Sequence, residues 1–228
     1  MSTLLGFPER EARLSAADSA RLRADAKYVD YPPGSVLMLE GAVSEHVFLL
    51  AKGVVKVTSV SGSGASKLLA IRGRGQLVGD FGCIDGSRRS GTVVAVTAAA
   101  AWRLSGDVFL RVLRADPALC FAVLEIMVAR VRESDGKLGE LGEYSARDRV
   151  IRLLARLVVN CVDEHSGDSV TIPVDQSELA GSAGVARETV CRTVTLLARS
   201  GIAHGRRGRI VVDDVPALLR QAQRTERR

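Results

Sequence analysis

Short runs rich in valine, leucine and isoleucine follow one another between residues 28 and 107, and glycines separate them. Examples are "HVFLLAKGVVKVTSV", "KLLAIRGRGQLVGDF" and "RRSGTVVAVTAAAAWRLS". Glycine breaks at such intervals are typical of turns between β-strands. This part of the chain is therefore predicted to form an antiparallel β-roll or sandwich.

A different pattern begins at Pro117 and continues to about Tyr144. Apolar residues recur there at alternating spacings of three and four, which is the heptad seam of a helix that pairs with a partner helix. The seam consists of Leu124, Met127, Val131, Ser134, Leu138, Leu141 and Ser145. We predict a dimerisation helix, although an amphipathic helix packed on its own domain would give a similar pattern. Gly136, Gly139 and Gly142 each cost about 1 kcal/mol of helix stability relative to alanine, so a bend or melted turn is expected there.

Helix, strand and turn signals follow one another closely after Arg147. "RDRVIRLLARLVVNCV" has the period of an amphipathic helix, and "SVTIPV" is predicted to be a short strand. In "DQSELAGSAG", Asp175 and Glu178 have the spacing of a capping box, and Gly184 interrupts the chain. The helix "VARETVCRTVTLLARSG" and the hairpin "GIAHGRRGRIVV" come next. Helix, glycine turn, helix and basic hairpin together predict a winged helix-turn-helix.

The fold class predicted from these patterns is α+β, with three regions along the chain. Residues 1–116 form the β-roll, residues 117–146 form the dimerisation helix and hinge, and residues 147–228 form the winged helix-turn-helix.

Composition excludes several classes of protein. The chain has 228 residues, of which 46% are hydrophobic and 25% charged, the profile of a globular protein that can bury a core. The sequence contains no run of eighteen or more apolar residues, so no membrane helix is predicted. The N-terminus lacks a signal-peptide pattern, and we therefore expect a cytoplasmic protein. The four cysteines are scattered, which argues against a zinc or iron–sulfur site, and His46 alone is poor evidence for the axial ligands of a haem. Because no nucleophile–base pair, carboxylate pair or metal set is recognisable, we do not expect an enzyme.

Positive charge is concentrated near the C-terminus. The net charge is +6, and the segment from Asp175 to Arg228 contains ten arginines and no lysine against six acidic residues. A basic surface there suits DNA. In a helix-turn-helix the second helix enters the major groove with its leading end, which here carries Arg187, Glu188 and Arg192. Arginine can bind guanine O6 and N7, and glutamate can accept from the cytosine amino group. An ion pair between Glu188 and Arg192 is the simpler alternative.

A second candidate site is the stretch "GQLVGDFGCIDGSRRSGTVVAV". Gly79 would let backbone N–H groups approach a phosphate, Arg89 would supply a charged fork, and Ser90 would supply a hydroxyl. Asp80 would bind a ribose hydroxyl. From the residues alone, a glycine-rich turn followed by a solvated loop is the favoured interpretation.

Both stretches resemble a known family. "RETVCR" looks like the recognition-helix signature of the Crp/Fnr family of bacterial transcription regulators, and the glycine-rich stretch resembles that family's phosphate-binding cassette. The resemblance covers nearly the whole chain. It implies a dimer that reads palindromic DNA with half-sites like TGTGA, is controlled by a cyclic nucleotide, with cyclic AMP favoured, and acts on RNA polymerase.

The resemblance also implies roles for individual residues. Those implied to bind the nucleotide are Gly79, Asp80, Phe81, Arg89, Ser90, Ser134 and Asp135. Those implied to bind DNA are Gln176, Arg187, Glu188, Arg192, Arg206 and Arg207. As a mechanism, we expect a nucleotide that contacts Ser134 to straighten the helix across its three glycines and so to orient the two winged helices.

Three residues depart from the family pattern. Asp80 replaces the usual glutamate, Asp135 replaces a hydroxyl residue, and Ala186 replaces the serine or threonine that caps the recognition helix. Cyclic GMP, another nucleotide or no ligand are therefore alternatives to cyclic AMP. A constitutive DNA-binding regulator with a degenerate pocket is the leading alternative function, and a nucleotide-binding module without a DNA role is a weaker one.

Overall fold

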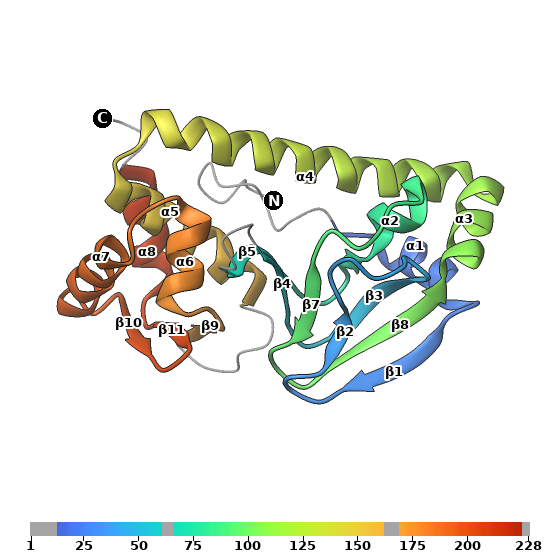
Figure 1. Ribbon diagram of the computed structural model, residues 1–228, viewed down its shortest axis with the longest axis horizontal. Helices are drawn as coiled ribbons and strands as arrows, with labels where there is room; N and C mark the ends of the chain where they lie inside the picture. Colours follow the sequence, from blue (N-terminus) through green and yellow to red (C-terminus); the bar gives the residue numbers. More distant parts are fainter. Residues whose placement is uncertain (1–12, 61–65, 162–168, 225–228) are drawn as a thin grey trace. The chain divides into compact units, whose positions relative to one another are not determined.

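The computed structural model describes residues 13–60, 66–161 and 169–224, without the side chains of Lys137 and Leu138 (Figure 1). The signal-peptide prediction concerned residues 1–12, which lie outside this description. The chain divides into two compact units. Among the described residues, the C-terminal unit contains those from 134 onward together with residues 60 and 66–70, and the N-terminal unit contains residues 13–59 and 71–133. No helix within the described ranges is long and apolar enough to cross a membrane.

The N-terminal part of the chain alternates short helices with antiparallel strands (Figure 1). Its elements are α1 (Ala16–Arg23), β1 (Lys27–Tyr31), β2 (Val36–Met38), β3 (His46–Lys52), β4 (Val55–Val60), β5 (Ser66–Arg72), β6 (Leu77–Val78), α2 (Asp80–Asp85), β7 (Thr92–Ala95), β8 (Ala99–Ser105), α3 (Gly106–Ala115) and α4 (Pro117–Glu143). The strands form two four-stranded sheets, ordered β1-β8-β3-β6 and β2-β7-β4-β5. The antiparallel β-roll predicted from the sequence is confirmed.

Strand β3 shows how the sequence produces this layered arrangement. Its side chains alternate between two faces, and both faces are buried. Val47 and Leu49 pack with residues of α1, α3 and α4 in one apolar cluster. Phe48 and Leu50 pack with residues of the second sheet in another. A continuous run of large apolar residues is therefore what this central strand requires.

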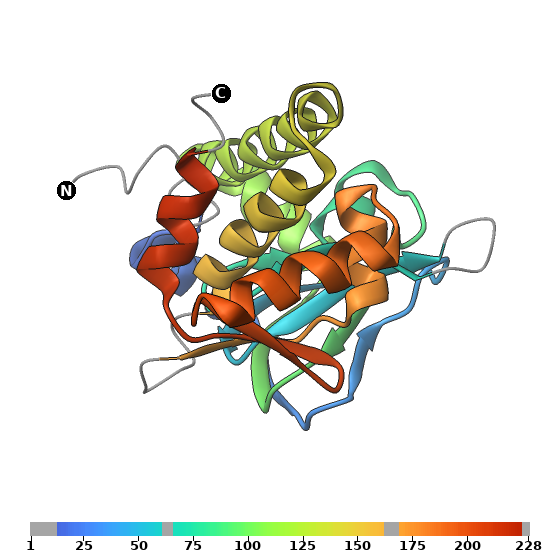
Figure 2. The ribbon, with the colours of Figure 1, turned by 90° about the vertical axis from the view of Figure 1, so that its left-hand side faces the viewer.

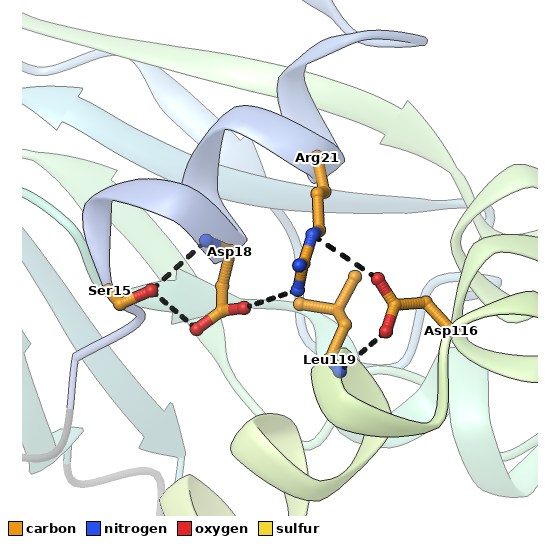
Figure 3. Close-up of polar contacts among 5 residues, drawn as sticks. All are labelled: Ser15, Asp18, Arg21, Asp116 and Leu119. Atoms are coloured by element: carbon orange, nitrogen blue, oxygen red, sulfur yellow. Dashed lines mark hydrogen bonds and ion pairs between the residues drawn. The ribbon is translucent and has the colours of Figure 1, made fainter.

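A polar cluster joins α1 to the start of α4 (Figure 3). Ser15 caps α1 by accepting a hydrogen bond from the Asp18 backbone N–H, and Arg21 donates to Asp18 at 3.0 Å. Arg21 also lies 3.3 Å from Asp116, whose other carboxylate oxygen accepts from the Leu119 N–H in the first turn of α4. The same carboxylate thus caps α4 and holds α1 beside it.

Helix α4 has one buried face and one exposed apolar face. Leu119, Val123 and Ile126 are buried in the N-terminal core. The exposed apolar residues of its first half are Phe121, Leu124, Val128 and Val131, with fractional exposures of 67%, 50%, 42% and 59%.

The predicted seam is therefore partly out of phase with the observed exposed face. Met127 was placed in that seam, but it packs against the N-terminal core. Leu124, Val131 and Leu141 are exposed as the seam requires, whereas the side chain of Leu138 lies outside the described part of the structure. The chain is α-helical through all three glycines in this conformation, and the bending or melting expected there stays a prediction.

The C-terminal unit is built from helices and a small antiparallel sheet (Figures 1 and 2). Its remaining elements are α5 (Ala146–Cys161), β9 (Val170–Ile172), α6 (Gln176–Ala183), α7 (Arg187–Arg199), β10 (Ala203–Arg206), β11 (Arg209–Val212) and α8 (Val215–Arg224). The sheet order is β10-β11-β9. Figure 2 shows α7 running beside the β10–β11 hairpin. This is the winged helix-turn-helix that the sequence predicts.

Arginines fix the last turn of α4 to the rest of the C-terminal unit. Glu140 is 7% exposed and accepts hydrogen bonds from Arg152 and Arg156 of α5. Burial alone would raise the pKa of Glu140, but these two guanidinium groups outweigh it and lower that pKa. Arg149 donates to the backbone carbonyl oxygens of Leu141, Tyr144, Ala183 and Gly184. Any bending of α4 near its glycines must therefore occur before Glu140.

Candidate functional site

The turn between α6 and α7 is determined by its local sequence. Asp175 accepts from the backbone N–H groups of Ser177 and Glu178, and Glu178 accepts from the Asp175 N–H, which confirms the capping box. Gly184 ends α6 in the left-handed region with φ +62°, a conformation that favours glycine. The chain then enters α7 through Ala186, whose side chain makes no capping hydrogen bond.

Helix α7 separates its apolar and charged residues cleanly. Val190, Val194 and Leu197 are at most 4% exposed and pack into the unit. Arg187, Glu188 and Arg192 are all exposed and gather at the leading end of the helix. Arg192 Nε donates to the Glu188 backbone carbonyl oxygen at 3.3 Å. Arg192 Nε is therefore bonded to the helix backbone, and the reading of DNA bases by this exposed face stays a prediction.

The hairpin beside α7 carries the predicted phosphate-binding arginines. Arg206 and Arg207 are exposed at its tip, where Gly208 adopts φ +70°. Gln176 is the first residue of α6, and its predicted contact with DNA stays a prediction. Its Oε1 accepts from Cys191 Sγ of α7 at 2.8 Å, and a Cβ built at Gly205 would lie 3.4 Å from its Nε2. Gln176 thus lies between α7 and the hairpin and is half-buried.

Sequence reasoning missed the roles of His204 and Asp213, which contact each other at the hairpin. His204 Nδ1 lies 2.7 Å from Asp213 Oδ2, and Arg206 Nε lies 3.2 Å from His204 Nε2. The alternation of the strand was the available signal, because His204 and Arg206 are two residues apart and lie on one face of β10.

The candidate nucleotide pocket is built around α2 in the N-terminal unit. Gly79 adopts φ +82° immediately before the helix, and a Cβ there would lie 2.6 Å from Arg89 Nη1. Asp80, the first residue of α2, is only 2% exposed. Phe81 is 45% exposed and Ser90 is exposed. The structure therefore brings together the glycine, acid, arginine and serine that the sequence singled out.

Arg89 is already bound to the protein itself. Its Nη1 donates to the Gly79 carbonyl oxygen at 2.7 Å, and its Nη2 donates to the His46 carbonyl oxygen at 2.6 Å. The residue is 7% exposed. Burial is the main cause that lowers the pKa of the His46 imidazole, and Arg103 and Arg89 contribute to it. Burial also raises the pKa of the nearby Cys83 thiol, which favours its protonated form.

Asp80 has a partner that sequence reasoning missed. Arg130 of α4 donates to both carboxylate oxygens, at 3.1 and 2.8 Å, and to the Leu77 carbonyl oxygen at 2.6 Å. Its guanidinium also lies 5.5 Å from the centre of the Phe81 ring. The sequence signal that could have indicated this role for Arg130 is its position four residues after the buried Ile126, on the core side of α4.

The other two predicted ligand residues are on the C-terminal half of α4. Ser134 and Asp135 are exposed and belong to the other compact unit, so their contact with a nucleotide stays a prediction. In the described ranges, no group of three or more histidine, cysteine, aspartate or glutamate side chains could hold a metal ion.

Two family models match the chain, one in each of the regions that contain the candidate sites. The family model of the cyclic nucleotide-binding domain matches residues 28–116. The family model of the Crp-like helix-turn-helix domain matches residues 148–221. Together these two models cover more than half of the chain.

Individual relatives match over most of the chain. The chain is 29% identical over 188 residues to the cyclic AMP receptor protein of Thermus thermophilus, covering 82% of this chain and 84% of that protein. It is 24% identical over 205 residues to a CRP-like cAMP-activated global transcriptional regulator of Mycobacterium tuberculosis, covering 90% and 92%.

Among solved structures, the c-di-GMP responsive global regulator of Xanthomonas campestris shares the fold. It has a TM-score of 0.69 and 20% identity, and the match covers 87% of this chain and 99% of that one. The layered β-roll with its glycine–acid–arginine turn, the capped helix-turn-helix with its wing and the two family matches lead to one conclusion: the chain belongs to the Crp/Fnr family of transcription regulators.

Proposed function

We propose that this regulator is a cytoplasmic homodimer that binds palindromic DNA with TGTGA-like half-sites and is controlled by a nucleotide, with cyclic AMP favoured. It then recruits or blocks RNA polymerase. The observation that carries the proposal is the leading end of α7, where Arg187, Glu188 and Arg192 are exposed on a helix whose opposite face is buried. Arginine and glutamate are suited to guanine and cytosine edges in the major groove.

The exposed face of α4 supports the homodimer. Phe121, Leu124, Val128 and Val131 follow one another at spacings of three, four and three, which is the period of a coiled-coil seam. Four large apolar side chains in a row on an open helix face favour burial against a partner helix. A second α4 offers the same stripe and would bury both.

Nucleotide control is proposed to act through α4. Arg130 on this helix binds Asp80 in the pocket, so a ligand that contacts Asp80 would alter how α4 is held. The C-terminal end of α4 is fixed by Glu140, and the segment between them contains Gly136 and Gly139. A nucleotide shifts the equilibrium only if it binds the DNA-competent conformation more tightly.

One observation favours a second candidate, a constitutive regulator with a degenerate pocket. Asp80 and Arg89 are both satisfied by groups of the protein itself. A nucleotide must therefore replace these hydrogen bonds, whereas a protein without an effector would keep them.

The experiment that separates the two candidates is fluorescence anisotropy with a labelled duplex carrying two TGTGA half-sites, at fixed salt, with and without cyclic AMP. Salt must be fixed because phosphate contacts make affinity steeply salt-dependent. Tightening of about tenfold or more, equivalent to about 1.4 kcal/mol, supports nucleotide control. Equal tight binding in both conditions supports the constitutive candidate. Binding no tighter than to a scrambled duplex contradicts the proposed DNA sequence.

A further inference from the structure

Three charged or polar side chains form a chain of contacts on the hairpin of the winged helix. Asp213, directly after β11, lies 2.7 Å from His204 Nδ1, and Arg206 Nε lies 3.2 Å from His204 Nε2. His204 and Arg206 share one face of β10 because they are two residues apart. The imidazole therefore stands between an acid and an arginine.

The chemistry of the neighbours assigns the imidazole protons. A guanidinium Nε–H can only donate, so His204 Nε2 must accept from Arg206. An ionised carboxylate can only accept, so His204 Nδ1 must carry the proton and donate to Asp213. Both requirements are met by one neutral tautomer, which means that Asp213 selects the form of His204 that can hold Arg206.

The strand register gives Arg206 a reason to need such support. Arg206 is paired directly with Arg209 across the hairpin, and both are exposed. Like charges placed opposite each other on one sheet face repel. The opposite face of the hairpin is fixed by Ala203 and Ile210, which are buried. The backbone is therefore well held, and the direction of the Arg206 side chain is set by its neighbours on the outer face.

We infer that His204 and Asp213 are positioning residues that hold the Arg206 guanidinium in the direction from which it binds a DNA phosphate. The bond uses Nε only, so both terminal nitrogens of Arg206 are left for a phosphate. The inference rests on the proposed DNA binding and adds to it two residues that would contribute without contacting bases. Arg207, at the same tip, is the natural comparison because it carries the same charge and is likewise exposed.

A double-mutant cycle on DNA affinity tests this role. We would measure anisotropy of the palindromic duplex over a range of salt concentrations for His204→Leu, Arg206→Ala and the double variant. For each half-site, Arg206→Ala is expected to weaken binding about threefold to fivefold, the size of one exposed charge contact, and to lower the salt slope by about one. His204→Leu should weaken binding to a similar extent, and should have no further effect once Arg206 is absent.

Two variants separate positioning from a general structural effect. His204→Gln retains one donor and one acceptor on its amide, so binding should return to within about twofold of the unmodified protein. In the Arg207→Ala background, His204→Leu should have the same effect as in the unmodified protein.

The opposite results would overturn the inference. One such result is that His204→Leu weakens DNA binding as much in the Arg206→Ala background as in the unmodified protein. The others are that His204→Leu leaves DNA affinity unchanged, or that His204→Gln binds DNA as weakly as His204→Leu. If Arg187→Ala weakens binding while His204→Leu does not, this inference fails and the proposed function stands. If the unmodified protein prefers a scrambled duplex or binds both equally, both fail.

Discussion

The predicted nucleotide pocket and the predicted DNA-reading face both contain arginines and one acidic residue, but they hold these groups in opposite ways. In the pocket, Asp80 and Arg89 are 2% and 7% exposed and are bonded to Arg130 and to backbone carbonyl groups. On the DNA-reading face, Arg187 and Arg192 are exposed at the leading end of α7. The first arrangement is complete within the protein, and the second is open to a partner.

This difference has consequences for how each site binds. A ligand that enters the pocket must replace existing hydrogen bonds of the buried Asp80 and Arg89 side chains. Its net affinity therefore depends on how well it forms hydrogen bonds with these two groups. Exposed arginines lose only water and counterions on binding, so their contribution depends strongly on salt. The pocket is therefore also a stability element of the β-roll, whereas the DNA-reading face contributes little to folding.

The largest effect is expected from Arg130→Met, which removes the partner of Asp80. Breaking a buried ion pair from one side leaves an uncompensated charge and should lower the free energy of unfolding by about 3–5 kcal/mol. Urea unfolding followed by circular dichroism measures this loss. Adding Asp80→Leu should recover part of it, because no unpaired carboxylate then remains buried.

An exposed ion pair provides the matched control. Lys52 and Asp30 lie 3.2 Å apart with side chains 56% and 68% exposed, so Lys52→Met should lower the free energy of unfolding far less than Arg130→Met does. Equal losses for Lys52→Met and Arg130→Met would show that the buried pair has no special role, and the contrast between the two sites would lose its basis.

A smaller effect, on DNA affinity, is expected from substitutions at the leading end of α7. Arg187→Ala and Arg192→Ala should each weaken binding by about 1–3 kcal/mol for each half-site of the palindrome, because each would lose a bidentate contact to guanine there. Both residues are exposed, so the free energy of unfolding should change by less than about 0.5 kcal/mol. Anisotropy with specific and scrambled duplexes, together with urea unfolding, measures both quantities.

Arg199 is the control for charge on the same helix. It is exposed in the last turn of α7, away from the leading end. Arg199→Ala should weaken specific and scrambled duplexes alike and leave their ratio unchanged. A loss of sequence preference for Arg199→Ala as large as that for Arg187→Ala would contradict the assigned orientation of α7.

Local signals made the DNA-reading face predictable from the sequence. The capping box, the left-handed Gly184 and the apolar period of α7 each involve residues within a few positions of one another. Their geometry is set by backbone chemistry that hardly depends on the rest of the fold. The position of Arg187 at the leading end of α7 follows directly from them.

The partners within the pocket could not be predicted in this way. Arg130 and Asp80 are fifty residues apart in sequence, and Arg89 bonds to the carbonyl of His46, forty-three residues away. Such contacts depend on how strands and helices pack, which periodicity does not encode. The phase of the α4 seam failed for a related reason: Met127 fits an apolar heptad equally well whether it faces its own core or a partner.

The smallest effect concerns the unfilled cap of the DNA-reading helix. Ala186 has the extended backbone of an N-cap residue, φ −68° and ψ 147°, but no side-chain oxygen to accept from the first turn. Ala186→Ser should therefore raise the free energy of unfolding by about 0.5–2 kcal/mol, which urea unfolding measures. If backbone geometry rather than the hydroxyl limits the cap, Ala186→Gly should also raise the free energy of unfolding, by only a few tenths of a kcal/mol less than Ala186→Ser does. A decrease with serine would show that the donors of the first turn are already satisfied, and the DNA-reading face would then resemble the pocket more than its exposure indicates.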